Sequence, residues 1–239
     1  GLSILTLFKK EYFNFKSMPL KQAFIKYKEF PLVNAPHVFS DQLLQRFGIS
    51  FLLLTYFGPE FLAFYALSNR YLKGPLRLIT GSVSTVFFQR TVEENIAKES
   101  SLKTILKTSI ISFLLGIPML ITLIFFGEYL FSFVFGQQWA RAGVIAGILS
   151  VSLFTNFLSS PISTIPITKG RQKSAFVFSV LGQGIPLLLC LLLVKSYFIF
   201  PLDIFVNDLA LQVLSVYSIT SSIYFLFLWL WYLNLSKIK

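Results

Sequence analysis

Six long apolar stretches alternate with short polar connections along the chain. A membrane-spanning helix needs about 20 mostly apolar residues, and six segments meet that requirement. They are residues 36–57, 61–88, 105–126, 142–165, 175–194 and 210–232. These segments fill most of the sequence and leave no room for a soluble domain. We therefore expect an all-α, polytopic membrane protein whose residues 36–232 form six transmembrane helices.

The apolar residues 1–8 (GLSILTLF) stand before the basic pair Lys9 and Lys10. A signal peptide has the opposite order, with its basic residues ahead of the apolar run. We expect residues 1–8 to be the end of a preceding transmembrane helix, so that the chain is one part of a larger protein. Residues 9–35 are then a basic cytoplasmic connection, and residues 233–239 are a cytoplasmic tail.

The composition narrows the class of protein. Hydrophobic residues make up 55% of the chain and charged residues only 13%, with a mean hydropathy of +0.72. Soluble domains have roughly 25% charged residues, and neither a soluble fold nor a disordered chain suits this much apolar surface. The one cysteine, Cys190, and the one histidine, His37, exclude a disulfide scaffold and a cysteine or multi-histidine metal site. We expect no metal and no cofactor.

The basic residues are strongly biased to one side of the expected membrane. With residues 9–29 placed in the cytoplasm, fifteen Lys and Arg residues fall on that side and only Arg141 and Lys195 on the other. Cytoplasmic loops of membrane proteins carry such an excess of Lys and Arg. The net charge of +11 therefore indicates a membrane orientation, with the C-terminus in the cytoplasm, and not nucleic-acid binding.

Three cations and no acid lie inside segment 61–88. At 100° per residue, Arg70, Lys73 and Arg77 fall within about 60° of one another around a helix. Ser84 lies in the same arc. All three cations facing lipid would cost roughly 8–10 kcal/mol, so we expect this cationic stripe to face protein or a water-filled cavity. Since Asp41 is the one acid in the expected spans, such a cavity favours an anion, and phosphate or pyrophosphate suits the donors of Arg and Lys.

Proline positions predict kinks. Segment 61–88 would be about 42 Å long as a helix, which exceeds a hydrocarbon core of about 30 Å. Gly74 and Pro75 lie in its middle, and we expect a kink or break there that makes this helix a moving part. Further kinks are predicted at Pro118, Pro161 and Pro186.

Polar residues crowd the beginning of segment 36–57. Asp41 is either a structural ion-pair partner or a proton- or ion-coupling residue, and His37 is either a polar cap or a second coupling residue. Arg46 lies near the middle of the segment. Helix packing explains the uncharged polar and small residues of the later segments. These are Asn156, Ser159, Ser160, Gly182, Gln183, Gly184, Gln212, Thr220, Ser221 and Ser222.

Several stretches, taken in order, resemble one known family. They are YKEFPLVNAP (27–36), FGPE (57–60), FYALSNRYLKGPLRLITGSVSTVFFQR (64–90), LFSFVFGQQWARAG (130–143), SVSLFTNFLSSPISTI (150–165) and GRQK (170–173). In these stretches the chain resembles the oligosaccharide flippases of bacterial surface-polysaccharide synthesis. These are O-antigen-type translocases of the multidrug/oligosaccharidyl-lipid/polysaccharide exporter superfamily. The matching stretches extend over nearly the whole chain.

The resemblance implies a transporter with two lobes of six helices and a cytoplasmic connection between them. This chain would be the second lobe, with spans seven to twelve. The residues that the family implies are Phe30, Pro31, Asn34 and Pro36 at the start of span seven, and Arg70 and Pro75 in span eight. Arg46 stands where the family leads us to expect an uncharged residue.

By this resemblance, the protein lies in the bacterial cytoplasmic membrane and moves a polyprenyl-pyrophosphate-linked oligosaccharide to the outer leaflet by alternating access. The product would be O-antigen, capsule or exopolysaccharide. The hypothesis assigns pyrophosphate and sugar binding to Arg70, Lys73, Arg77 and Arg46, and coupling or gating to Asp41, His37, Asn34 and Pro75. The expected partners are the lipid-linked oligosaccharide, the bilayer, the N-terminal lobe, and polysaccharide polymerase and chain-length proteins.

Three alternatives stay open. An ion-coupled multidrug exporter of the same superfamily would need intramembrane acids, and Asp41 is the one available. A membrane polysaccharide polymerase or ligase would need a large outer loop with catalytic groups, whereas the longest, 195–209, is small and mostly apolar. A non-transporting scaffold would tolerate charge reversal of the cationic stripe. We expect no enzyme activity and assign no catalytic residue.

Overall fold

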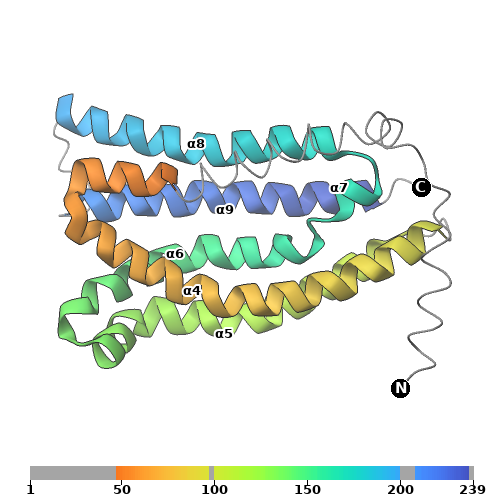
Figure 1. Cartoon of the computed structure of the whole chain (residues 1–239), viewed down its shortest axis with the longest axis horizontal. Coiled ribbons are helices and arrows are strands. Elements are labelled where there is room, and N and C mark those ends of the chain that lie inside the picture. The colour runs from red at the N-terminus through yellow and green to blue at the C-terminus, as the bar shows by residue number, and fades with distance from the viewer. Residues whose placement is uncertain (1–46, 97–99, 200–207, 237–239) are drawn as a thin grey trace, which may run out of the picture. The chain divides into compact units, whose positions relative to one another are not determined.

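The computed structural model describes residues 47–96, 100–199 and 208–236, and this part consists of helices and short connections without a strand (Figure 1). Five helices are long: α4 (Ile49–Ile96), α5 (Leu102–Phe135), α6 (Ala140–Ser159), α8 (Gln172–Ile199) and α9 (Leu209–Ser236). Three short helices lie between them: η2 (Gln137–Trp139), η3 (Ser160–Ile162) and α7 (Ile165–Thr168). The all-α prediction is confirmed for the described residues.

Five stretches of described helix are long and apolar enough to cross a membrane. They are Ile49–Glu94, Leu102–Phe135, Gln137–Thr168, Gln172–Tyr197 and Leu209–Ser236. Their lengths and compositions support a multi-pass membrane protein. The expected number of six is not confirmed, because only the last part of segment 36–57 is described and it belongs, with segment 61–88, to the element α4. Residues 36–46 lie outside the described part of the chain.

Gly58 divides α4 into two helices. Its φ of 82° and ψ of 175° belong to a region that is essentially confined to glycine, since a side chain there costs of order 1–3 kcal/mol. Pro59 follows and suits the first turn of a new helix, where a missing N–H leaves no bond unmade. The chain turns back at this point (Figure 1). The break therefore corresponds to the expected connection between segments 36–57 and 61–88.

Of the kink or break expected at Gly74 and Pro75, a break does not occur, and a kink of the continuous helix there stays a prediction. The helix α4 continues through both residues, and Gly58 is the one residue inside it with a non-helical backbone. Membrane helices tolerate proline where neighbouring groups satisfy the freed carbonyl. The expected loop 89–104 is also mostly helical, because α4 continues to Ile96 and α5 begins at Leu102.

The other three prolines divide in their effects. Pro161 lies in η3, where the span Gln137–Thr168 changes from α-helix to 3₁₀-helix, so the sequence placed this irregularity correctly. Pro118 and Pro186 remain inside the continuous helices α5 and α8. Of these three prolines, only Pro161 thus lies where the type of helix changes.

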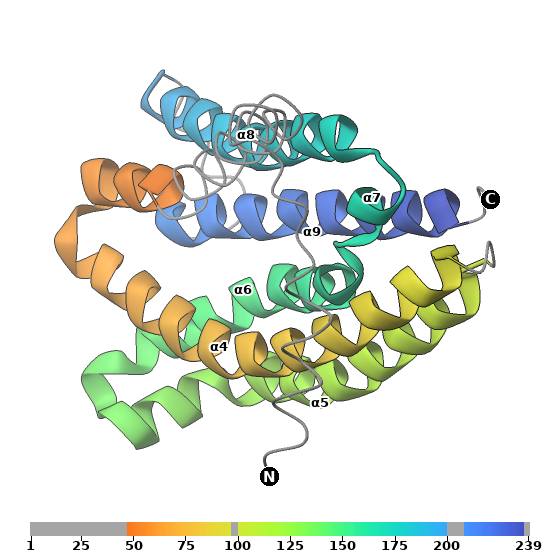
Figure 2. The same ribbon diagram turned by 45° about the vertical axis from the view of Figure 1, so that its right-hand side comes forward.

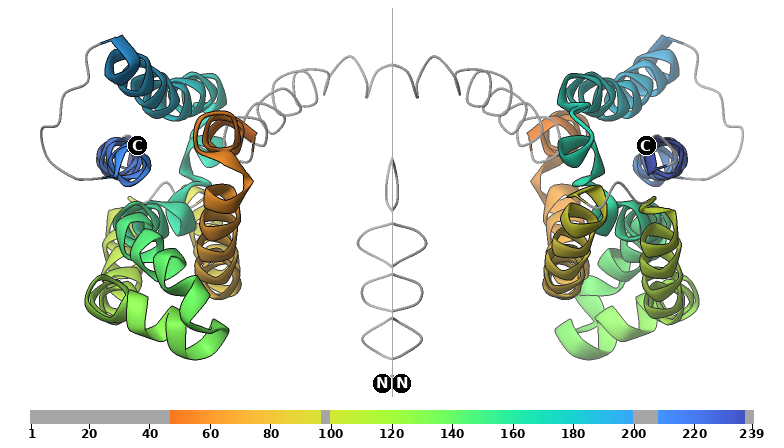
Figure 3. Two further views of the ribbon diagram at one scale, coloured as in Figure 1. Left: turned by 90° about the vertical axis from the view of Figure 1, so that its left-hand side faces the viewer. Right: turned by 90° about the vertical axis from the view of Figure 1, so that its right-hand side faces the viewer.

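The helix α6 lies at the centre of the described helices. It packs against α4, α5 and α9, while α8 packs against α9 (Figures 2 and 3). The most apolar part of its span is 61% buried, against 22–33% for the other four spans. Ile145, Ala146 and Leu149 of α6 form part of the apolar core. The position of α6 explains why its polar residues contact the inside of the protein and not lipid.

Small residues let α5 and α6 approach closely. A Cβ added at Gly143 would lie 2.2 Å from the backbone oxygen of Gly127, and one added at Gly127 would lie 2.7 Å from the oxygen of Gly143. A Cβ at Gly147 would lie 3.1 Å from the oxygen of Leu123. Gly143 and Gly147 form the small-xxx-small pattern that permits such contacts between membrane helices.

Hydroxyl and indole groups join α6 and α9 to their neighbours. Ser68 of α4 donates a hydrogen bond to the carbonyl oxygen of Ala142 at 2.6 Å. Ser218 of α9 donates to the carbonyl oxygen of Ile148, also at 2.6 Å. The Nε1 of Trp229 donates to the Oγ of Ser109 at 2.8 Å, which joins α9 to α5. In a bilayer such bonds stabilise the contacts between helices. They also satisfy polar donors and acceptors with which the lipid chains cannot form hydrogen bonds.

Candidate functional site

Three polar side chains follow one face of α4 and line a cavity inside the protein. Tyr65, Asn69 and Lys73 are four residues apart, so they lie one above another on the helix. Tyr65 is only 4% exposed. Lys73 stands about 18 Å along the helix from Phe61, deep within a hydrocarbon core of about 30 Å. The cationic residue at this depth therefore faces a polar cavity and not lipid.

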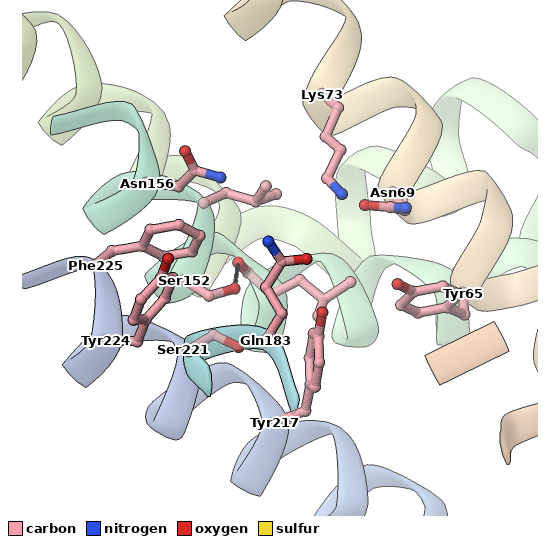
Figure 4. A pocket seen from close by; sticks show the side chains of 13 residues that line it. Tyr65, Asn69, Lys73, Ser152, Asn156, Gln183, Tyr217, Ser221, Tyr224 and Phe225 are labelled. Atoms are coloured by element: carbon pink, nitrogen blue, oxygen red, sulfur yellow. Dashed lines mark hydrogen bonds between the residues drawn. The ribbon is translucent and has the colours of Figure 1, made fainter. Parts of the chain in front are cut away.

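The facing walls come from α6, α8 and α9 and are also polar. The side chains on them with hydroxyl or amide groups are Ser152, Asn156, Gln183, Tyr217, Ser221 and Tyr224. In Figure 4, Lys73 and Asn69 extend from α4 towards Gln183 of α8, and Tyr217 points its hydroxyl into the same space. Four helices that are far apart in the sequence thus contribute to one cavity, which we call the polar cavity.

A second cavity adjoins the polar cavity and shares Lys73, Leu153 and Asn156 with it. Arg77, from the next turn of α4, also lines it, together with Ser160, the first residue of η3. The polar cavity has a volume of about 50 Å³ and the second cavity about 310 Å³. The first has room for a few water molecules, and a sugar would need the walls to move apart.

The described residues on these walls carry charges of a single sign. Lys73 and Arg77 are the charged residues among the described ones that line the two cavities, and none of the described Asp or Glu residues lines either cavity. The cations are joined by neutral donors and acceptors from hydroxyl and amide groups. Such a combination can bind an anionic group through charge-assisted hydrogen bonds and a sugar through neutral ones.

The structure separates the members of the expected cationic stripe. Lys73 lines both cavities, Arg77 lines the second, and Arg70 is exposed and lines neither. Ser84, which shares the arc, donates a hydrogen bond to the carbonyl oxygen of Pro161 at 3.3 Å. This bond shows that the far end of the stripe packs against the irregular turn of the central span.

The remaining expected site residues have different outcomes. Asn34, His37, Asp41 and Arg46 lie outside the described residues, so their roles stay predictions. Pro75 is exposed on α4 and lines neither cavity. Its expected role in gating also stays a prediction.

Several cavity residues were missed or interpreted differently from the sequence. Asn156, Gln183 and Ser221 were assigned to helix packing, yet all three line the polar cavity. Tyr65 and Asn69 were not singled out, although their spacing of eight and four residues before Lys73 places them on its face. Tyr217 and Tyr224 belong to a generally apolar helix and carried no comparable signal.

Gly182 makes room for one cavity side chain. A Cβ added at Gly182 would lie 1.9 Å from Cε2 of Tyr224, so the ring occupies the space that any other residue would fill. Gly184, two residues on, has no atom within 4 Å of such a Cβ. The two neighbouring glycines of α8 therefore have different structural roles.

Gly182→Ala is expected to lower the free energy of unfolding by about 1–3 kcal/mol, because the methyl group displaces the ring of Tyr224. The same change in a Tyr224→Ala background should cost much less, since the clashing ring is gone. Thermal unfolding of the purified protein in detergent, for the two single variants and the double variant, measures this coupling. Gly184→Ala is the matched control. Equal losses in the free energy of unfolding in both backgrounds would show that the cost of Gly182→Ala does not come from a clash with the ring of Tyr224.

Comparison with known proteins gives two partial similarities. Residues 38–144 match the family of polysaccharide biosynthesis proteins. The teichuronic acid biosynthesis protein TuaB of Bacillus subtilis (strain 168) is 27% identical over 144 residues, which is 57% of this chain and 29% of that protein. The chain therefore spans less than a third of this relative. No solved structure matches the chain at a significant level. Together with the five long apolar helices, these similarities support a multi-pass membrane protein related to polysaccharide biosynthesis.

Proposed function

We propose that the chain is part of a flippase that moves a polyprenyl-pyrophosphate-linked oligosaccharide across the cytoplasmic membrane for surface-polysaccharide assembly. The observation that carries the proposal is the polar cavity, in which a deeply placed Lys73 stands among hydroxyl and amide groups and no acid is found among the described lining residues. The cation suits the pyrophosphate and the neutral groups suit the sugar. The polyprenyl tail can stay in the bilayer, so only the head group needs this path.

Transport requires the cavity to open. At about 50 Å³ the polar cavity is too small for an oligosaccharide, which agrees with a mechanism in which two lobes rock between inward-open and outward-open states. The other wall of the substrate path would come from an N-terminal lobe. The cytoplasmic location of the C-terminus and the partnership with polymerase and chain-length proteins belong to the same proposal.

A deletion strain of the source bacterium tests this function. Loss of the flippase should remove surface polysaccharide and leave single lipid-linked repeat units on the cytoplasmic side. The side is read by treating intact cells with a membrane-impermeant sugar-modifying enzyme, which should not reach them. Reintroduction of the full-length gene should restore the polysaccharide.

Other results would support the alternatives instead. Repeat units that accumulate on the outer face would indicate a polymerase or ligase, and absence of repeat units would indicate a synthetic enzyme. Unchanged surface polysaccharide with increased drug sensitivity would indicate a multidrug exporter. Each of these results would overturn the flippase proposal.

A further inference from the structure

A second cationic site lies between α4 and α5, outside the polar cavity. It is a groove with a volume of about 520 Å³. Arg90 of α4 and Lys103 and Lys107 of α5 line it. All three are exposed. None of them lines either of the two cavities already described, so the groove is a separate site.

The groove changes from cationic to apolar along its length. On α5, Lys103, Lys107 and Ile111 follow one another at intervals of four residues, so they form one stripe. On α4, Val83 and Val86 precede Arg90 in the lining. The end of α4 precedes the beginning of α5 by a few residues, so the three cations gather at the same end of the groove. The apolar side chains lie towards the other end.

This change from cationic to apolar matches the change from head groups to acyl chains across one leaflet of a bilayer. From Pro59, Val83 is about 36 Å along α4 and Arg90 about 47 Å, by the helix rise. A hydrocarbon core is about 30 Å thick, and about 40–45 Å with the head-group regions. With ordinary tilt, the cations stand at head-group depth and the apolar end reaches into the acyl chains. The excess of basic residues places this end in the cytoplasmic leaflet.

The three cations keep their charge available. None of them forms an ion pair within the part of the chain that the structure describes, where the one ion pair joins Arg141 to Asp208. The neighbouring acid Glu94 accepts a hydrogen bond from the hydroxyl of Thr104. Since Val86 is 65% exposed and Ile111 is 40% exposed, the apolar end is open to the surrounding lipid.

We propose that this groove binds an anionic phospholipid of the bilayer, with its phosphate on Arg90, Lys103 and Lys107 and an acyl chain along Val86 and Ile111. Basic pockets between membrane helices on the cytoplasmic side are suited to such head groups. A free phosphate would use only the cationic end, and a zwitterionic lipid would leave the positive charge uncompensated. The site does not depend on the proposed transport activity.

Native mass spectrometry of the full-length protein in detergent tests the proposal. The probes are phosphatidylglycerol and phosphatidylcholine with the same acyl chains, each offered at the same ratio to protein. We expect at least fivefold more bound phosphatidylglycerol than phosphatidylcholine. The triple variant Arg90→Gln, Lys103→Gln, Lys107→Gln should lose at least fivefold of the phosphatidylglycerol binding.

A charge-matched control separates binding in the groove from a general attraction of the anionic lipid to a positively charged protein. The triple variant Lys169→Gln, Arg171→Gln, Lys173→Gln removes the same charge from another loop expected on the same side. It should change binding less than twofold. Val86→Trp keeps all three cations and fills the apolar end, so it should also weaken binding. Loss in the loop control equal to that in the groove variant would overturn the proposal.

The unmodified protein gives an independent readout if the groove variants fail to fold. A phosphatidylglycerol analogue with a photoreactive group on its acyl chain should form its adduct within residues 82–111. An adduct elsewhere would overturn the assignment. Displacement of phosphatidylglycerol by an equal concentration of inorganic phosphate would identify an anion site without a lipid, and preferential displacement by polyprenyl phosphate would identify a substrate site. Either result would also reject the proposed occupant.

Discussion

Replacing Gly143 by leucine is expected to abolish the stable fold of the protein. A Cβ at this position would already lie 2.2 Å from the backbone oxygen of Gly127. Backbone cannot rotate away as a side chain can, so α5 and α6 must separate. Gly143→Ala should then lower the free energy of unfolding by about 1–3 kcal/mol, and the larger leucine should leave little protein to purify. Size-exclusion profiles and thermal unfolding in detergent measure both variants.

The control for this prediction is Gly184→Ala, which adds a methyl group to a membrane helix where no atom lies within 4 Å of it. Alanine is a better helix former than glycine, so this variant should match the original protein or exceed its stability. A second control, Gly81→Ala, makes the same change on α4, also with no contact within 4 Å. Wild-type stability of Gly143→Leu would show that the two helices do not approach as the structure has them.

This contact was readable in part from the sequence. The pair Gly143 and Gly147 has the spacing of a close membrane-helix contact, but the pattern does not name the partner. Gly127 is the partner because of the register between α5 and α6, which depends on all the side chains between them. Periodicity along one helix carries no information on the register between two.

The same limit explains what could be predicted of the polar cavity. Charge drew attention to Lys73 and Arg77, and both line cavities. Arg70 lies in the same arc of α4 yet lines neither cavity, since the arc is wider than the strip that faces α6. Asn156 and Gln183 resembled ordinary packing residues because a single helix does not reveal which neutral groups converge with those of other helices.

The expected spans were more predictable than their ends. Apolar runs identified the described spans because lipid demands about 20 apolar residues. The helices then continue past these runs: α4 reaches Ile96 and α5 begins at Leu102, where the sequence indicated a loop. Helical hydrogen bonding can continue beyond the bilayer. Hydropathy therefore defines the length of helix inside the membrane and not the residue at which the helix ends. The expected break at Pro75 is absent for a related reason, since a proline inside a membrane helix need not interrupt it.

Lys73→Glu is expected to reduce export of surface polysaccharide at least tenfold. The change places a carboxylate among cavity walls whose described residues include no other acid, opposite the expected pyrophosphate. A tenfold loss in rate corresponds to about 1.4 kcal/mol, and a like-charge contact in such a site costs several kcal/mol. Lys73→Met, which keeps the length and removes the charge, should be intermediate, and Lys73→Arg should retain most of the export. The assay is complementation of the deletion strain by the full-length gene, with polysaccharide scored at equal protein level in the membrane.

Lys195→Glu is the matched control for Lys73→Glu. It reverses one charge at an exposed position towards the end of α8, away from both cavities, and should change export less than twofold. The pattern across the four variants separates a binding cation from a structural one. If Lys73 only stabilised the fold, the loss of export in each variant would follow its loss of protein level and of thermal stability. Full export by Lys73→Glu at normal protein level would remove Lys73 from the substrate path, because a negative wall cannot hold a pyrophosphate.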